Sequence, residues 1–322
     1  MLKKNLSRSA VMMAALATAA GVALGPAQAS ADTPPLSGAR IAVHFDPAQG
    51  RTPENIALAP GGDAYVTFAA GRQVAKVTPD GVTKVLATLP APADGGVHTP
   101  VLGFALTTGI VRAPDATLYF LYATGTPDLT GLWRLRPGGR PQRIAALPAD
   151  GLPNGLALDA RTRTLYITDS VRGTIWRVPT RGGTPVAWST APELAPAGFL
   201  GANGLKFRKG ELWATNLDKG TVLRIPVERD GRAGRVRTEA TGLPGIDDFA
   251  FTGRGEQLLA ALNGSSQVAL VQPDGSHSIV LSGADGLQNP TSIALSGTSV
   301  YVMSAAYLTA KDPNMLLARL TK

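Results

Sequence analysis

A repeat of about 50 residues is the feature that most constrains how this chain can fold. In its clearest copy, the segments 152–159, 164–169 and 174–178 are short, rich in β-branched and aromatic residues, and separated by tight polar breaks. The same order follows at 201–207, 211–216 and 221–226, and the first segment of both copies contains Asn-Gly-Leu. A fixed period of this kind indicates an architecture built from repeated units.

Aligned on this stretch, the chain contains six copies, each with one reference position at the start of its first apolar strand. Successive positions are 48, 52, 49, 44 and 44 residues apart: Glu54, Leu102, Asn154, Asn203, Asp247 and Thr291. Four strands at such a period make one blade of a propeller. The sequence therefore predicts an all-β fold, a six-bladed β-propeller of four-stranded antiparallel blades. A β-solenoid is the weaker alternative, because its repeats are shorter and the capping segments are missing.

The two ends of the repeat array predict how the ring closes. Copies one to five have a fourth, outer strand, whereas copy six runs out of chain after its third strand. An additional strand at 40–45 precedes copy one. We expect this strand to become the outer strand of the last blade, which would remove an exposed sheet edge.

The first 31 residues have the pattern of a signal peptide. Lys3, Lys4 and Arg8 precede an apolar run at 10–24, and Ala27-Gln28-Ala29 follows as a small-x-small cleavage site. The run is shorter than the roughly 20 residues that a membrane span needs. We therefore predict cleavage near Ala29 or Ala31, no membrane anchor, and a secreted protein, periplasmic or extracellular, whose residues 32–322 form one domain.

Composition narrows the classes of partner. Three of the 31 basic residues precede Asp32, so the remaining chain has 28 basic and 23 acidic side chains, a net charge of +5. The arginines are scattered, and no basic run is interleaved with aromatic residues, so nucleic-acid binding is not expected. An exported chain without cysteine must be held together by its core. We expect a monomer that binds a small molecule.

The six reference positions predict a cation site. The first strand of each propeller blade lines the central channel, so these positions should converge at one end of it, and five of the six are polar. Leaving such groups buried and unpaired costs about 1–3 kcal/mol each. Ca²⁺ binds carboxylate and amide oxygens, and the lack of Cys and His at these positions disfavours softer metals. The alternative is that these residues cap strand starts, as Asn-Gly does in turns, and the Asx residues that end second strands (Asp169, Asn216, Asn263) are assigned to that role.

At these residues the chain resembles the SMP-30/gluconolactonase/LRE-like family of six-bladed propellers, over roughly residues 40–320. Pro53-Glu54 looks like the family's metal-binding glutamate, and Asn203-Gly204-Leu205 looks like its metal-ligand motif. Asp247 stands where the family has the aspartate that binds metal and acts as base, and Asn154 matches an asparagine that contacts substrate. The resemblance implies a divalent cation, Ca²⁺ by preference, held by Glu54, Asn203 and Asp247, and hydrolysis of a lactone or related ester.

The chain also departs from that family. Its sugar lactonases have an arginine two residues before the asparagine of the third blade, where this chain has Leu152. Its usual Pro-Asp-Gly motif is replaced here by Ile246-Asp247-Asp248, which makes Asp248 an alternative ligand if the register shifts by one. A site without that guanidinium, and with Leu102 facing it, is less suited to a polyhydroxy acid.

One histidine and one loop complete the expected site. His98 lies in the loop that enters blade two, and we expect it near the channel mouth as a contact to substrate, a solvated loop histidine being the alternative. The apolar loop 191–200 is either a lid or a packed connection between blades. Two other functions remain open: a non-catalytic propeller with a structural cation that binds a ligand or a cell-surface partner, and a lyase of the streptogramin-inactivating type. The lyase would need a His and Glu pair at the metal, and His98 is the only histidine near enough.

Overall fold

The computed structural model describes residues 35–93 and 98–321, so the predicted signal peptide lies outside the described residues. The described chain forms six antiparallel sheets of four strands each, which confirms the predicted six-bladed propeller. Three helical turns accompany them, η1 (Pro47–Gln49), η2 (Pro192–Leu194) and η3 (Gly283–Asp285). Within the described residues, no helix has the length and apolar character needed to span a membrane.

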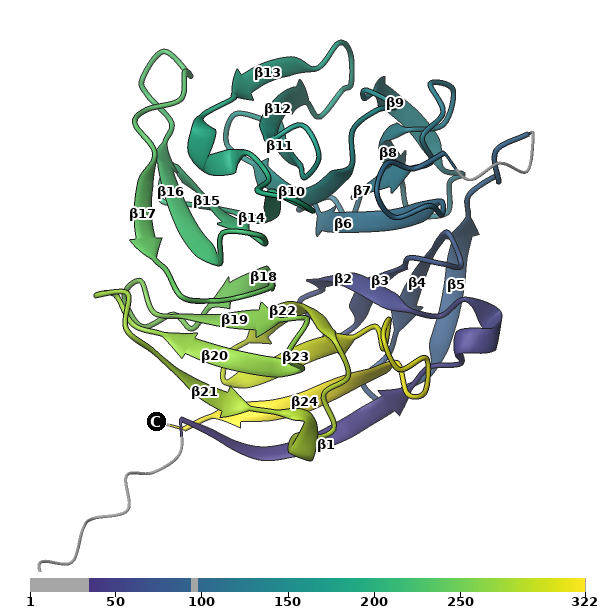
Figure 1. The fold of residues 1–322 in the computed structure, drawn as a ribbon. Helices are drawn as coiled ribbons and strands as arrows, with labels where there is room; N and C mark the ends of the chain where they lie inside the picture. The colour runs from purple at the N-terminus through teal and green to yellow at the C-terminus, as the bar shows by residue number, and fades with distance from the viewer. Residues whose placement is uncertain (1–34, 94–97, 322) are drawn as a thin grey trace, which may run out of the picture. The chain divides into compact units, whose positions relative to one another are not determined.

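The blades follow one another in chain order, each beginning with its innermost strand (Figure 1). The first blade comprises β2 (Pro53–Leu58), β3 (Ala64–Phe68), β4 (Gln73–Val77) and β5 (Thr83–Thr88); the second β6 (Leu106–Arg112), β7 (Leu118–Ala123), β8 (Gly131–Leu135) and β9 (Gln142–Ala146); the third β10 (Pro153–Asp159), β11 (Thr164–Asp169), β12 (Thr174–Pro179) and β13 (Val186–Ser189). The fourth comprises β14 (Ala202–Arg208), β15 (Glu211–Asn216), β16 (Thr221–Pro226) and β17 (Arg237–Ala240); the fifth β18 (Ile246–Phe251), β19 (Leu258–Leu262), β20 (Gln267–Val271) and β21 (His277–Leu281). The sixth comprises β22 (Pro290–Ser296), β23 (Ser299–Ser304), β24 (Asn314–Leu320) and β1 (Leu36–His44).

The ring closes as the sequence predicts. Strand β1 pairs antiparallel with β24, with Ile41 opposite Leu316 and His44 opposite Asn314, so strands from the two ends of the described chain lie side by side (Figure 1). Each innermost strand contacts that of the next blade, and β22 contacts β2. The closing strand begins at Leu36, four residues earlier than predicted.

The innermost strand of the second blade begins later than the sequence alignment predicts. Residues 102–105 form a loop, and β6 begins at Leu106. The residue equivalent to Thr291 is Thr108, because Thr108 Oγ1 donates to Pro153 O in the next blade (2.8 Å) as Thr291 Oγ1 donates to Pro53 O (3.0 Å). The alternating apolar residues of 102–106 imitate a strand, but they cover the end of the channel instead. With Thr108 in place of Leu102, all six equivalent positions are polar.

The glycine of the repeated Asn-Gly-Leu has a packing role. Gly155 lies against the backbone of the next blade, where a Cβ atom would stand 2.2 Å from Asn203 O and 2.9 Å from Leu205 N. Gly109 meets Asn154 O in the same way, at 2.4 Å. Only a residue without a side chain allows the inner strands to approach so closely. The motif thus places a polar side chain at the channel and a glycine against the neighbouring blade.

Apolar side chains fill the spaces between neighbouring blades. Between blades three and four, Tyr166, Ile175 and Leu205 belong to one buried cluster, and the rings of Tyr166 and Trp188 meet edge to face at 5.1 Å. Each fully buried side chain of this size contributes about 1.5–3 kcal/mol to folding. These clusters hold the innermost strands in a ring and leave their polar first residues facing the channel.

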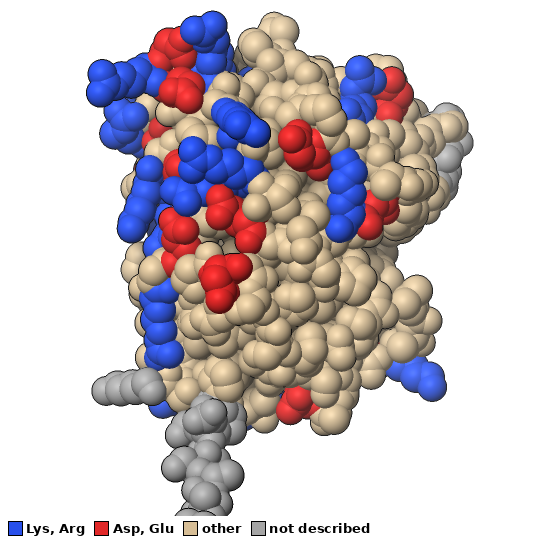
Figure 2. All heavy atoms as spheres, turned by 60° about the vertical axis from the view of Figure 1, so that its left-hand side comes forward, with Lys and Arg blue, Asp and Glu red and all other residues tan. Residues whose placement is uncertain are grey.

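Charges on the face seen in Figure 2 are mixed in sign. Lys and Arg side chains there are interspersed with Asp and Glu, and the lower part of the face is largely uncharged. Arg224 is an example of such pairing within the described chain, with guanidinium nitrogens 2.8 Å from Glu211 and 3.2 Å from Glu256. This face has no continuous basic surface. That the protein does not bind nucleic acid remains a prediction from the sequence.

Candidate active site

A cavity of about 320 Å³ lies at the end of the channel where the innermost strands begin. Its floor is made by the second residues of four of those strands and by one residue that follows β19: Glu54, Asn154, Asn203, Asp247 and Asn263. Its walls come from the loop before β6, the loop before β14, the loop between β15 and β16 and the loop between β23 and β24. The structure therefore brings together four of the site residues predicted from the sequence.

The floor contains two buried carboxyl groups that repel each other. Glu54 and Asp247 are 8% and 7% exposed. Burial raises the pKa of the Glu54 carboxyl from 4.5 to about 7, although a hydrogen bond from Tyr307 opposes the rise and the charge of Asp248 adds to it. Burial, and then the charges of Glu54 and Asp248, raise the pKa of Asp247 well above its usual 3.8. Two carboxylates are thus held where their negative charge has little solvent to stabilise it.

Neighbouring donors fix the geometry of this floor. Tyr307 Oη donates to Glu54 Oε2, and Asn263 Nδ2 donates to Asp247 Oδ2 at 3.3 Å. The side-chain amide of Asn203 also lowers the pKa of the Asp247 carboxyl. Asn154 Nδ2 donates to Ser170 Oγ (3.2 Å), which in turn donates to Ala202 O at 2.7 Å. The carboxyl groups and amides are therefore oriented before any ligand arrives.

The chemistry of these donors fits a hard divalent cation. The two carboxylates and three side-chain amides of the floor can supply only oxygen ligands, the kind that Ca²⁺ prefers. Glu54, Asn203 and Asp247 would hold the ion, and its positive charge would offset the burial and the neighbouring negative charges that raise both pKa values. Among the described residues, no three His, Cys, Asp or Glu side chains lie together as a metal site, so the fit depends on the amides as well as on the two carboxylates.

Asp248 belongs to a different part of the channel. It is 2% exposed and does not line the cavity. Its Oδ2 atom accepts from Lys206 Nζ at 2.5 Å and from Asn55 Nδ2 at 3.2 Å. Because successive side chains of a strand point to opposite sides, the residue next to Asp247 is turned away from the floor. The structure therefore places Asp247, and not Asp248, at the cavity.

The walls of the cavity are apolar. Leu152, which is completely buried, packs in one cluster with Leu106 and Leu200, and Leu102 and Phe104 lie against it. The carboxylate of Asp218 holds the loop before β14, since its oxygens accept from the backbone nitrogens of residues 197, 199 and 200 at 2.7–3.1 Å. The wall residues from these loops are Leu102, Phe104, Phe199, Leu200, Leu217 and Leu308. The loop that the sequence predicts as either lid or connection thus lines the cavity.

The structure does not bring His98 to this cavity. Its side chain is exposed, in the loop before β6, and it is not among the lining residues. His98 stands ten residues before Thr108, the true equivalent position, and not four residues before it as the alignment suggested. His44 and His277, the other two histidines, do not line the cavity either.

Two polar residues of the site are not predicted by the sequence. Asn263 has the position of a turn-forming residue, a role that Asp169 does play, since its Oδ1 accepts from Arg172 N at 3.0 Å. The Asn263 amide instead reaches Asp247. Tyr307 lies in a loop that no repeat predicts; the residue is 38% exposed, while its hydroxyl reaches Glu54. Its pKa is raised well above 10 by burial, and then by the charge of Glu54.

The raised carboxyl pKa values predict an unusual pH dependence for the metal-free protein. Glu54 has a pKa of about 7 in the fold against 4.5 ordinarily, so the folded state binds the proton more tightly than the unfolded state. This contribution is complete below pH 4.5 and is lost as pH rises through 7. Chelator-treated protein should therefore be more stable at pH 5.5 than at pH 8, by about 1–3 kcal/mol in urea unfolding.

Glu54→Gln provides the control for this pH dependence. Its amide does not titrate, so the difference between the two pH values should shrink. Ca²⁺ added at pH 8 should restore stability to the wild-type protein, because it binds only the folded state. Equal stability of the wild-type protein at both pH values would contradict the proposed repulsion.

The comparisons with known proteins agree with this fold. No family model matches the chain, and none of the curated proteins does. Among solved structures, a gluconolactonase from Xanthomonas campestris is similar with a TM-score of 0.59 and 15% identity, over 90% of this chain and 97% of its own. A calcium-binding protein, regucalcin, from Agrobacterium tumefaciens has a TM-score of 0.61 and 15% identity, covering 84% and 92%. A virginiamycin B lyase from Staphylococcus aureus has a TM-score of 0.57 and 14% identity, covering 88% and 100%. At such identities, the likeness shows the propeller fold alone.

Proposed function

We propose that this protein is an exported, monomeric hydrolase of lactones or related esters that depends on a divalent cation, Ca²⁺ by preference. The observation that carries the proposal is a floor of two buried, mutually repelling carboxyl groups and three amides beneath apolar walls. Support also comes from the similar fold of a gluconolactonase and of a calcium-binding regucalcin. Export is proposed from the signal-peptide pattern of residues 1–31.

The residues of the floor have separate roles in ester hydrolysis. When bound, the cation supplies Lewis-acid polarisation of the carbonyl oxygen. Asp247 accepts a proton from the attacking water while the new bond forms between the water oxygen and the carbonyl carbon. The ester C–O bond then breaks, and the proton passes from Asp247 to the leaving alkoxide. Asn154, held by Ser170, orients the substrate, and Tyr307 fixes the carboxyl group of Glu54.

The walls of the cavity determine which kind of ester or lactone fits. Apolar side chains from four loops surround the floor, and no charged residue among the described residues lines the cavity other than Glu54 and Asp247. A sugar lactone would leave its hydroxyl groups without partners against these walls, which costs about 1–3 kcal/mol for each buried group. The substrate is therefore a compact ester with an apolar body, and the volume of about 320 Å³ suits a small molecule.

Metal depletion and a substrate panel test the proposal together. Chelator-treated protein should hydrolyse neither aryl esters nor alkyl-substituted γ- and δ-lactones, and Ca²⁺ should restore both activities. The value of kcat/KM should be at least about tenfold higher for an alkyl-substituted lactone than for a sugar lactone of the same ring size. Absence of any cation-dependent turnover over the panel would overturn the hydrolase proposal.

Two rival functions give different outcomes. A non-catalytic propeller with a structural cation would bind Ca²⁺ and gain stability, yet show no turnover. A lyase of the streptogramin-inactivating type is disfavoured, because none of the three histidines lines the cavity. If a lyase reaction occurred nevertheless, its product would carry a new carbon–carbon double bond and no added water, which mass spectrometry distinguishes from hydrolysis.

A further inference from the structure

A second, larger cavity opens at the other end of the channel. It has a volume of about 630 Å³ and is lined by the later residues of all six innermost strands, four of which supply their second residue to the floor of the first cavity. No residue lines both cavities. The proposed hydrolase chemistry makes no use of this second cavity.

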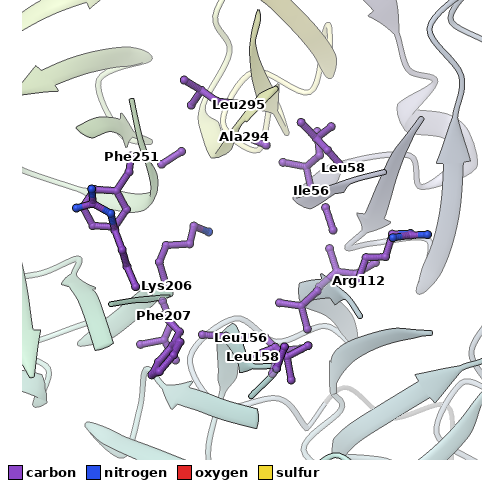
Figure 3. A pocket seen from close by; sticks show the side chains of 18 of the residues that line it. Ile56, Leu58, Arg112, Leu156, Leu158, Lys206, Phe207, Phe251, Ala294 and Leu295 are labelled. Carbon is purple, nitrogen blue, oxygen red and sulfur yellow. The ribbon is translucent and has the colours of Figure 1, made fainter. Parts of the chain in front are cut away.

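Apolar side chains make up most of its wall. Figure 3 shows Ile56, Leu58, Leu156, Leu158, Phe207 and Leu295 arranged around the opening, contributed by four different blades. Sites for small organic molecules have this character, with volumes of about 300–1,000 Å³, mainly apolar walls and a few polar groups that fix orientation.

Every charged residue that lines this cavity is basic: Arg112, Lys206 and Arg208. The Lys206 side chain extends toward the middle of the opening (Figure 3). Its ammonium group has three donors, and the hydrogen bond that is described for it goes to Asp248 Oδ2. The Arg112 side chain, by contrast, is directed away from the middle of the opening (Figure 3). An acceptor from outside the chain would therefore pair with the remaining donors of Lys206.

We propose that this second cavity binds a small amphipathic anion, a carboxylate with an apolar body, whose carboxylate pairs with Lys206. The apolar body removes the surrounding leucine, isoleucine and phenylalanine side chains from water. The negative head group complements three basic residues, of which only Lys206 is paired with a carboxylate in the described chain. A cationic head group would be repelled, and a neutral one would gain no charge-assisted hydrogen bond.

Octanoate is a suitable probe, and octylammonium and octan-1-ol, which have the same chain length, serve as comparison ligands with a cationic and a neutral head group. Isothermal titration calorimetry on the full chain should show that octanoate binds more tightly than either of the other two. Lys206→Met should weaken octanoate binding at least about tenfold, the value of one charge-assisted hydrogen bond. Lys209→Met is the matched control, because Lys209 is exposed three residues further on and lines neither cavity.

Two further variants guard against misfolding and against the wrong site. Leu58→Glu places a negative charge in the wall without touching the Lys206–Asp248 pair, and it should also abolish octanoate binding. Phe104→Asp alters only the wall of the first cavity and should leave octanoate binding unchanged. The proposal is overturned if the three head groups bind equally well, if Lys206→Met and Leu58→Glu both retain octanoate affinity, or if Phe104→Asp alone removes it.

Discussion

Asp247→Asn should reduce cation-dependent ester hydrolysis by about 10³-fold or more, the largest effect that we expect of any single substitution in the site. The substitution removes the group that accepts the proton from water and replaces one of two anionic ligands by a neutral amide. Ca²⁺ affinity, measured by calorimetry, should therefore fall together with kcat. The fold should persist, because the amide has nearly the same shape and can still accept from Asn263 Nδ2.

Stability separates a chemical role of Asp247 from a structural one. Burial raises the pKa of the Asp247 carboxyl, so its charged form is unfavourable in the metal-free fold. Metal-free Asp247→Asn should therefore be at least as stable as the wild-type protein in urea at pH 8, even though its activity is lost. Asp150→Asn is the control, since that side chain is 74% exposed and its pairing with Arg172 is on the surface; it should change neither activity nor affinity. Retained activity in Asp247→Asn would remove this residue from the mechanism.

Asn154→Ala should affect substrate rather than cation. Asn154 lines the cavity and is held by Ser170, whereas the Asn203 amide acts on the carboxyl group of Asp247. We expect KM for the preferred ester to rise about tenfold in Asn154→Ala, while Ca²⁺ affinity stays within about twofold of the wild-type value. Loss of Ca²⁺ affinity in this variant would make Asn154 a ligand and would revise the assignment of the floor.

The sequence predicts the blades well because each blade is a local pattern. Alternating apolar residues and turn residues are read within some 50 positions, and the polar residue that opens each innermost strand keeps the same place in that pattern. The repeat alone is therefore enough to predict that Glu54, Asn154, Asn203 and Asp247 meet at one end of the channel, as they do. The closing strand is predictable too, because an unpaired outer edge in the last blade demands a partner.

What the sequence does not predict depends on how loops cross the end of the channel. Leu102 aligns with a strand because 102–106 alternates like one, although the structure uses these residues as a wall. Thr108 is missed by the alignment because the second copy lacks the Asn-Gly-Leu motif that marks copies three and four. Tyr307 meets Glu54 across more than 250 residues, and nothing in the repeat specifies which loop provides such a contact. Local pattern thus specifies the floor of the site, whereas the walls are set by tertiary packing.

The second large effect is expected on the fold, from Gly155→Ala. A Cβ atom at this position would stand 2.2 Å from Asn203 O, 2.8 Å from Thr168 Oγ1 and 2.9 Å from Leu205 N. Two of these three atoms belong to the backbone of the next blade, which cannot move without disturbing the packing between blades. We expect a loss of about 3 kcal/mol in the free energy of unfolding, at the upper end of what overpacking usually costs.

The same substitution should reach the site, because the carbonyl that the new Cβ displaces is that of Asn203, a proposed cation ligand. Ca²⁺ affinity should therefore fall along with stability, although Gly155 itself contacts no ligand. Gly283→Ala is the matched control, since its Cβ would meet nothing within 4 Å; both quantities should stay at wild-type values. A fully stable Gly155→Ala protein with unchanged affinity would mean that neighbouring blades can separate at the channel without cost, and that the glycine of Asn-Gly-Leu serves neither packing nor the positioning of Asn203.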